Sequence, residues 1–139
     1  ARTRLCAVFR LTLASAAALV PGSVSAQSLR DLRAQETEER ALQREVSYTS
    51  DVCRRPITAS IDWASMKTWP PRESIAGACD GALAAVETIC RAGRRNVVHH
   101  FVCAGDGSGA ALSGKTLRYG ASPYGNGYAA TLAIIGAAE

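Results

Sequence analysis

The sequence lacks a hydrophobic run long enough to cross a membrane. Its first apolar run, Leu11 to Val20, has about ten residues, whereas a membrane-spanning helix needs roughly 20. Three arginines and no acidic residue precede this run, and a Pro-Gly pair and small residues follow it as far as Ala26. This order is typical of a secretory signal peptide. We therefore expect residues 1–26 to be a signal peptide that is cleaved before Gln27.

Little net charge is left once that segment is removed. The whole chain carries 16 Lys and Arg residues against 12 Asp and Glu residues, a net charge of +4. Three of the arginines lie in residues 1–26, so residues 27–139 keep 13 basic residues against the same 12 acidic ones. This balance gives no basis for binding nucleic acid or an anionic membrane. We expect a periplasmic or secreted protein with no nucleic-acid partner and no stable membrane span after cleavage.

Closely spaced cysteine pairs are also absent. Cys53, Cys79, Cys90 and Cys103 follow one another at spacings of 26, 11 and 13 residues. Zinc sites and c-type haem sites use C-x-x-C pairs instead. We therefore expect no metal and no cofactor. The chain has five cysteines, and Cys6 lies in the expected signal peptide. The four that remain, an even number in a small exported chain, predict two disulfide bonds.

The region that follows the expected cleavage site has a helical pattern. Residues 28–46 contain no glycine or proline and are rich in helix-forming residues. Large apolar residues are few and form at most one thin edge; they are Leu29, Leu32, Leu42 and Val46. We expect residues 27–48 to be a charged, solvated helical arm. The alternative is an arm for docking or for weak self-association through residues 28–46.

The compact part of the protein is expected to cover residues 49–139. Pro56 disfavours helix at the residue before it, so we expect residues 49–56 to be a break. Alternating apolar residues over 57–63 then predict a strand. A regular apolar stripe predicts a helix over residues 73–93, which is the strongest helical pattern in the chain.

The remainder of the compact part predicts two more strands and a final helix. The strands are residues 96–103 and 110–120, and Gly114 predicts a bulge in the second of them. Residues 128–139 are rich in alanine, which favours a helix capped by Asn126 over a strand that follows a hairpin turn. The expected order after the arm is β-α-β-β-α, a small single α+β domain with helices on one face of a sheet.

This element order predicts how the cysteines pair. Cys79 and Cys90 lie on one predicted helix, ~16 Å apart along its axis, so they cannot bond to each other. The strand after that helix runs back along it and brings Cys103 level with the helix start, beside Cys79. The first strand begins near the helix end, which places Cys53 beside Cys90. The sequence therefore predicts the disulfides Cys53–Cys90 and Cys79–Cys103.

One stretch matches a phosphate-binding motif. Residues 109–116, GAALSGKT, fit the pattern G-x-x-x-x-G-K-[ST]. A phosphate loop needs a helix that begins at the Gly-Lys-Thr step, with its N–H groups aimed at the phosphates. Here only three residues separate Thr116 from Gly120 and the next loop, so no useful helix fits. We interpret the match as accidental and expect Lys115 on the solvent side of a strand.

The remaining catalytic patterns are incomplete. Gly107 separates Asp106 from Ser108, unlike the adjacent Asp-Ser of serine-protease loops. His99 and His100 are neighbours in a predicted strand, so they point to opposite faces and cannot share one metal ion. The spacing leaves open a triad of one histidine with Ser108 and Asp106, but nothing in it favours one. We expect no catalytic residue.

The glycine-rich loops of residues 104–127 form the most suggestive surface. Aromatic residues on such loops can anchor a protein or stack on a sugar; the alternative is that Trp63 and Tyr119 belong to the core and the glycines only form turns. The candidate binding residues are Trp69, Asp106, Ser108, Tyr124 and Asn126. We expect a non-catalytic interaction module of the cell envelope, with an envelope protein or a glycan as its partner. The alternative is a small periplasmic hydrolase or enzyme inhibitor that uses the same loops.

Overall fold

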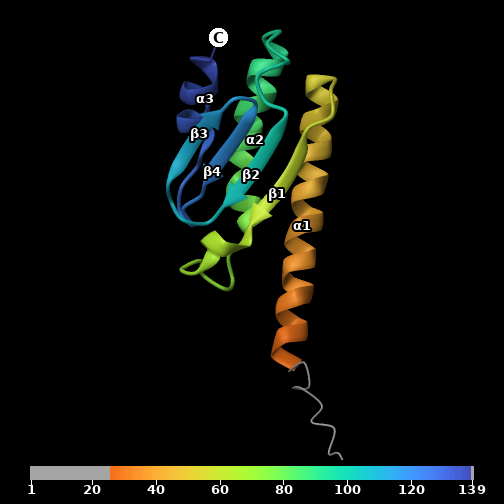
Figure 1. The fold of residues 1–139 in the computed structure, drawn as a ribbon, viewed down its shortest axis with the longest axis vertical. Coiled ribbons are helices and arrows are strands. Elements are labelled where there is room, and N and C mark those ends of the chain that lie inside the picture. Colours follow the sequence, from red (N-terminus) through yellow and green to blue (C-terminus); the bar gives the residue numbers. More distant parts are fainter. Residues whose placement is uncertain (1–25, 139) are drawn as a thin grey trace, which may run out of the picture.

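The protein is a single α+β domain over residues 26–138, which are the residues that the computed structural model describes. The expected signal peptide lies outside this range except for its last residue. Figure 1 shows the elements in the order α1 (Ala26–Cys53), β1 (Thr58–Asp62), the short 3₁₀ helix η1 (Trp63–Met66), α2 (Ile75–Arg91), β2 (His100–Ala104), β3 (Gly109–Ser113), β4 (Thr116–Gly120) and α3 (Tyr128–Gly136). The expected fold class is confirmed.

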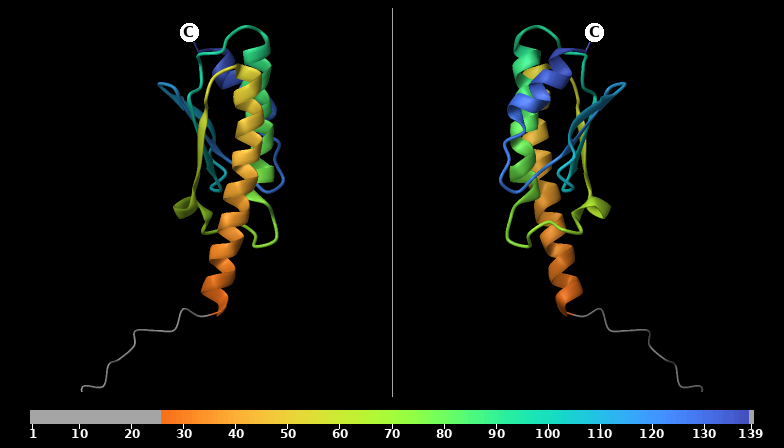
Figure 2. Two further views of the ribbon diagram at one scale, coloured as in Figure 1. Left: turned by 90° about the vertical axis from the view of Figure 1, so that its right-hand side faces the viewer. Right: turned by 90° about the vertical axis from the view of Figure 1, so that its left-hand side faces the viewer.

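The four strands form one mixed sheet with the order β1-β2-β4-β3. β1 pairs with β2 and β2 with β4 in parallel, whereas β3 is antiparallel to β4. All three helices lie on one face of the sheet, as the two side views in Figure 2 show. Ile61, Phe101 and Leu117 are buried in the core of the domain. None of the three α-helices in the described part of the chain covers the opposite face of the sheet.

The strand expected over residues 110–120 is two strands. β3 and β4 form a hairpin in which Ser113 pairs with Thr116, so Gly114 and Lys115 make a two-residue turn. Gly114 has a φ of +59°, which suits the first turn position of a type II′ hairpin. The predicted bulge at Gly114 is therefore wrong, and the order after α1 contains one more strand than expected.

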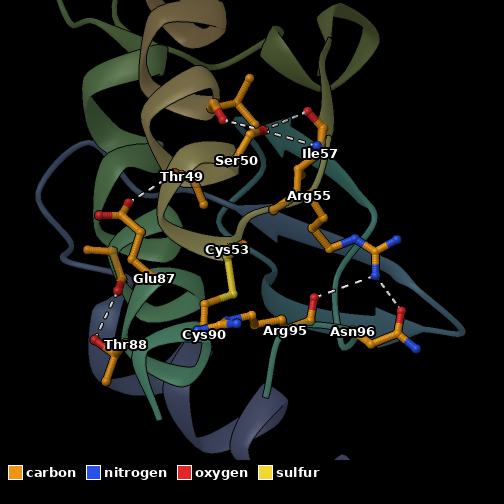
Figure 3. Close-up of a disulfide and its surroundings, with 12 residues drawn as sticks. Thr49, Ser50, Cys53, Arg55, Ile57, Glu87, Thr88, Cys90, Arg95 and Asn96 are labelled. Atoms are coloured by element: carbon orange, nitrogen blue, oxygen red, sulfur yellow. Dashed lines mark hydrogen bonds between the residues drawn. A yellow bond between two sulfur atoms is a disulfide. The ribbon is translucent and has the colours of Figure 1, made fainter. Parts of the chain in front are cut away.

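Both predicted disulfides are confirmed. Cys53 bonds to Cys90 with a Cα–Cα distance of 5.0 Å, and Cys79 bonds to Cys103 with a Cα–Cα distance of 6.0 Å. The first bond joins the end of α1 to the end of α2, as Figure 3 shows. The second joins the first turns of α2 to the end of β2. Together they tie two helices and the sheet to one another.

The helix α1 continues through residues that were expected to form a break. It ends only at Cys53, before Arg54, which has a φ of +52°. Pro56 restricts only the residue before it, so residues 49–53 are free to stay helical. Leu42, Val46 and Thr49 are all buried, and α1 packs against α2. The second half of α1 is therefore part of the core, and its first half extends past the end of the sheet (Figure 1).

The helix α2 begins and ends where its caps predict. The Ser74 hydroxyl accepts a hydrogen bond from the Gly77 N–H at 3.0 Å. Gly93 has a φ of +95°, and the Arg94 N–H donates to the Ile89 carbonyl, which closes a Schellman motif. Gly81, for which the sequence gives no reason, is explained by packing. A Cβ there would lie 2.6 Å from Asn126 Oδ1, so glycine lets the start of α3 approach α2.

One carboxylate is buried between α1 and α2. Glu87 is 8 % exposed, and its Oε2 accepts a hydrogen bond from the Thr49 hydroxyl at 2.9 Å (Figure 3). Burial raises the pKa of Glu87, and the nearby charge of Asp80 raises it further; the Thr49 hydrogen bond and Arg91 act in the opposite direction without cancelling the rise. At neutral pH the ionised form of Glu87 therefore opposes folding.

Replacing Glu87 with glutamine should stabilise the protein at neutral pH. The amide oxygen still accepts from Thr49, but no charge is buried. We expect the melting temperature at pH 7.5 to rise by about 2–4 °C. A raised pKa favours the folded state once the carboxyl is protonated, so the difference should shrink as the pH falls through that pKa toward about 4. Glu36→Gln, on the exposed face of α1, is the control and should give no rise; an equal rise would assign the effect to net charge.

Candidate functional site

Two of the expected site residues, Asp106 and Ser108, meet at the carboxyl end of the sheet, but their partner is an arginine. The Ser108 hydroxyl donates to Asp106 Oδ1 at 2.7 Å, and Arg118 Nη2 donates to Asp106 Oδ2 at 2.7 Å. Arg118 also donates to the Ser108 oxygen at 2.9 Å and to Asp62 Oδ2 at 3.2 Å. These hydrogen bonds hold the pKa of Asp106 well below its usual range. The cluster is an ionic clamp that ties the loop after β2 to β4.

The histidines lie too far from this clamp to form a triad with Ser108. His100 begins β2 and Ser108 follows its other end, which puts them roughly 13 Å apart along the strand direction. His99 Nε2 lies 2.6 Å from Asn96 Oδ1, and His100 Nδ1 contacts the Thr58 hydroxyl. Partial desolvation and the nearby cations Arg55 and Lys115 lower the pKa of His99. No histidine stands next to Ser108 as a base.

The phosphate-binding motif is a hairpin in the structure. Residues 109–116 are β3, the two-residue turn and the first residue of β4. Lys115 therefore lies in the turn, and the prediction that it lies on a strand is wrong. Its ammonium contacts the Asn96 carbonyl, and its own carbonyl accepts from the His99 and His100 N–H groups. Thr116 continues into β4 and not into a helix, so no helix N-terminus is aimed at a phosphate there.

The other two residues predicted on the loops lie apart from the clamp. Tyr124 is 91 % exposed. Asn126 Oδ1 accepts from the Tyr128 N–H at 2.9 Å, but the N-cap of α3 is Gly127, one residue later than expected. Asn126 also borders a hollow of about 310 Å³ beside Gly81. Tyr119 is buried in the core. The loops of residues 104–127 thus do not bring their candidate residues together at one site.

A larger groove lies elsewhere and contains Trp69. It has a volume of about 490 Å³ and lies between the first half of α1 and the segment from η1 to the start of α2. Its lining combines aromatic, apolar and acidic side chains: Asp31, Ala34, Gln35, Thr37, Glu38, Trp63, Met66, Trp69, Pro70, Pro71, Glu73 and Ile75. We call it the tryptophan groove. Of the residues predicted for a binding surface, only Trp69 belongs to it.

One wall of the tryptophan groove continues the buried face of α1. Asp31, Gln35 and Glu38 precede Leu42 and Val46 at helical spacings of three and four residues, so all five lie on one side of the helix. The N-terminal part of α1 extends past the end of the sheet (Figure 1), and on this side of the helix the residues that precede Leu42 are polar. The groove therefore lies where the core-facing side of α1 changes from buried apolar residues to polar ones.

The opposite wall is held in place by hydrogen bonds to both indoles. Trp63 Nε1 donates to Glu39 Oε1 at 2.8 Å, and Trp69 Nε1 donates to the Glu73 carbonyl at 2.8 Å. Glu38 Oε2 accepts from the Ser74 hydroxyl at 2.8 Å and from the Ala76 N–H at 2.9 Å, which joins α1 to the start of α2. These hydrogen bonds restrict the orientations of both indole rings.

The segment from η1 onward also rests on the loop that follows β2. The Gly105 N–H donates to the Ser65 hydroxyl at 2.9 Å. A Cβ at Gly105 would lie 2.5 Å from Met66 Sδ and 3.1 Å from Trp69 Cε3, so only glycine allows this approach. The sequence had suggested only turns for this glycine and for the two prolines. The clustering of two tryptophans and two prolines within residues 63–71 was the pattern that could have indicated the groove.

The side chains that line the groove limit the chemistry it can do. Its described lining offers flat aromatic rings and carboxylates but no serine, cysteine or histidine that could act as nucleophile or base. Across residues 26–138, no group of three or more His, Cys, Asp or Glu residues could hold a metal ion. No helix within that range is long and apolar enough to span a membrane.

The comparisons with known proteins leave this geometry as the only guide to function. Comparison of the chain with known protein families, with curated proteins and with solved structures gives no significant match.

Proposed function

We propose that the protein is an exported, non-catalytic binding module of the cell envelope, whose ligand occupies the tryptophan groove. The observation that carries this proposal is the groove itself, where Trp63 and Trp69 are fixed by hydrogen bonds beside carboxylates. Binding sites commonly combine such preorganised aromatic surface with a few polar groups. A segment of an envelope protein suits a groove that is open along the side of α1.

Catalysis is less well supported. Ser108 donates its hydroxyl hydrogen to Asp106, whose charge is already held by Arg118. A serine nucleophile needs a base that takes its proton, and a carboxylate bound to arginine is a poor base. The small hydrolase or inhibitor that uses residues 104–127 therefore remains the second candidate.

The disulfide bonds support the proposal that the protein is exported. Two disulfide bonds in a small domain indicate an oxidising environment. We expect the exported protein to begin at Gln27, because small residues precede that position. Amino-terminal sequencing of the protein recovered outside the cytoplasm checks this. An exported form that retains residues 1–26 would contradict the cleavage.

Peptide display with two alanine variants tests the proposed site. Peptides selected on the wild-type protein should bind the Trp69→Ala variant at least tenfold more weakly, because the ring supplies much of the groove surface. Tyr124→Ala is the matched control, since it removes an exposed aromatic residue from the loops of residues 104–127. Its affinity for the same peptides should change less than twofold.

The reverse pattern would contradict the proposal. Ligands that Tyr124→Ala loses and Trp69→Ala retains would place the site on the loops. Hydrolysis of ester or peptide substrates that Ser108→Ala abolishes would identify an enzyme. Ligands found on a glycan array, and lost in Trp69→Ala, would keep the groove but replace a protein partner with a sugar.

A further inference from the structure

We propose that the tryptophan groove binds a basic peptide segment, with an arginine or lysine side chain lying along the tryptophan rings. This inference rests on the proposed function and adds the chemical class of the ligand. Three observations lead to it: the charge of the lining, the way the indoles are held, and the contrast with the other side of α1.

The charge of the groove is of one sign. Its lining includes Asp31, Glu38 and Glu73 and no lysine, arginine or histidine. Glu38 is used to join α1 to the start of α2. Asp31 comes from α1 and Glu73 from the segment before α2, and both residues are exposed. A cation in the groove therefore lies between carboxylates of two different elements.

The indoles offer their faces and not their N–H groups. Both Nε1 atoms already donate, one to Glu39 and the other to the Glu73 carbonyl. A ring whose N–H is engaged can still attract a cation through its electron-rich face. Met66, Pro70 and Pro71 add apolar surface that suits the aliphatic stem of a long basic side chain. Arginine fits best because its planar guanidinium stacks on rings and pairs with carboxylates.

The hollow on the other side of α1 differs from the groove, because it already contains a basic side chain. A hollow of about 350 Å³ there is lined by Glu36, Glu39, Arg40 and Gln43 together with residues of β1. Arg40 pairs with Glu36 at 3.7 Å, so a cation is already present. Gln43 Nε2 donates to the Ala59 carbonyl and covers part of the sheet edge. Of these two hollows along α1, the tryptophan groove has acidic residues without a basic residue in its lining, and the other has both.

The intrinsic fluorescence of the protein reports the occupancy of this groove directly. The chain contains two tryptophans, and both line the groove. The probe is a capped pentapeptide with two arginines separated by alanine, and its twin carries citrulline, which has the same shape without the charge. We expect saturable binding of the arginine peptide that is at least tenfold tighter than binding of the twin. Raising the salt concentration from about 0.05 M to about 0.5 M should weaken the binding of the arginine peptide several-fold.

Two double variants test whether the carboxylates of the groove, and not the negative charge of the whole surface, bind the arginine peptide. Asp31→Asn with Glu73→Gln should weaken the arginine peptide about tenfold or more and leave the citrulline peptide unchanged. Glu36→Gln with Asp51→Asn removes the same charge from exposed positions outside the groove and should change the affinity less than twofold. Thermal melting of both double variants checks that they are folded.

Each outcome decides the proposal. Equal affinity for the two peptides would overturn the cationic ligand and leave groove binding in place. No saturable response to the arginine peptide at millimolar concentration would also overturn the cationic ligand. The peptide-display experiment tests the proposed function separately. A dimer in sedimentation that Trp69→Ala dissociates would assign the groove to a second copy of the chain, contrary to the proposal. Tenfold selectivity that only the groove variant removes would establish it.

Discussion

Replacing Leu42 with alanine should lower the free energy of unfolding by about 2–5 kcal/mol. Leu42 is fully buried in the hydrophobic core, so its removal leaves a cavity there. Leu32→Ala is the matched control on the same helix, because Leu32 is 58 % exposed. We expect it to change stability by no more than about 0.5 kcal/mol. Urea unfolding followed by circular dichroism measures both values.

The comparison decides whether α1 is an arm or a part of the domain. If α1 were a solvated arm along its whole length, the two substitutions would have similar small effects. The structure predicts a large difference between residues that lie ten positions apart on one helix. Equal effects of the two variants would contradict the burial of the second half of α1.

Removing the disulfides should have an effect of similar size. Cys53 and Cys90 are 37 residues apart, and Cys79 and Cys103 are 24 residues apart. In the chain-entropy model each bond contributes about 3–4 kcal/mol by restricting the unfolded chain. We expect each double serine variant to lose about 3–4 kcal/mol of unfolding free energy. Reduction of both bonds should unfold a domain of this size at about 37 °C.

The measurements are urea unfolding of the two double variants and peptide mapping without reductant. Mapping should give Cys53–Cys90 and Cys79–Cys103. Fragments that join Cys53 to Cys79 would contradict the fold, because those residues lie at the end of α1 and near the start of α2. A fully reduced protein that keeps a cooperative melt well above 37 °C would show that the packing of the helices suffices without the bonds.

Much of the fold could be predicted from local patterns. The apolar stripe and caps of α2 are properties of neighbouring residues, and Ser74 and Gly93 lie where a helix needs them. The disulfide pairing followed from helix length and strand direction alone, because a bond tolerates only short Cα distances. These features need no knowledge of distant contacts.

The hairpin could also have been found from the sequence. Leu112 falls on one strand parity, whereas Leu117 and Tyr119 fall on the other. In one continuous strand these residues would face opposite sides of the sheet. A two-residue turn at Gly114 and Lys115 brings Leu112 opposite Leu117, which puts them on the same side. The change of parity indicates a turn, whereas the glycine at position 114 taken alone suggests a bulge.

The sequence by itself determined the disulfides, the α+β class and the helix boundaries set by Ser74 and Gly93. Only the tertiary structure decided that the second half of α1 is buried, that Asp106 and Ser108 form a clamp with Arg118, and that Trp63 and Trp69 share a groove. The physical reason is the range of the interactions. Helical periodicity, caps and turns depend on residues a few positions apart, whereas burial of a sparse apolar stripe and the lining of a groove depend on which distant segments pack together.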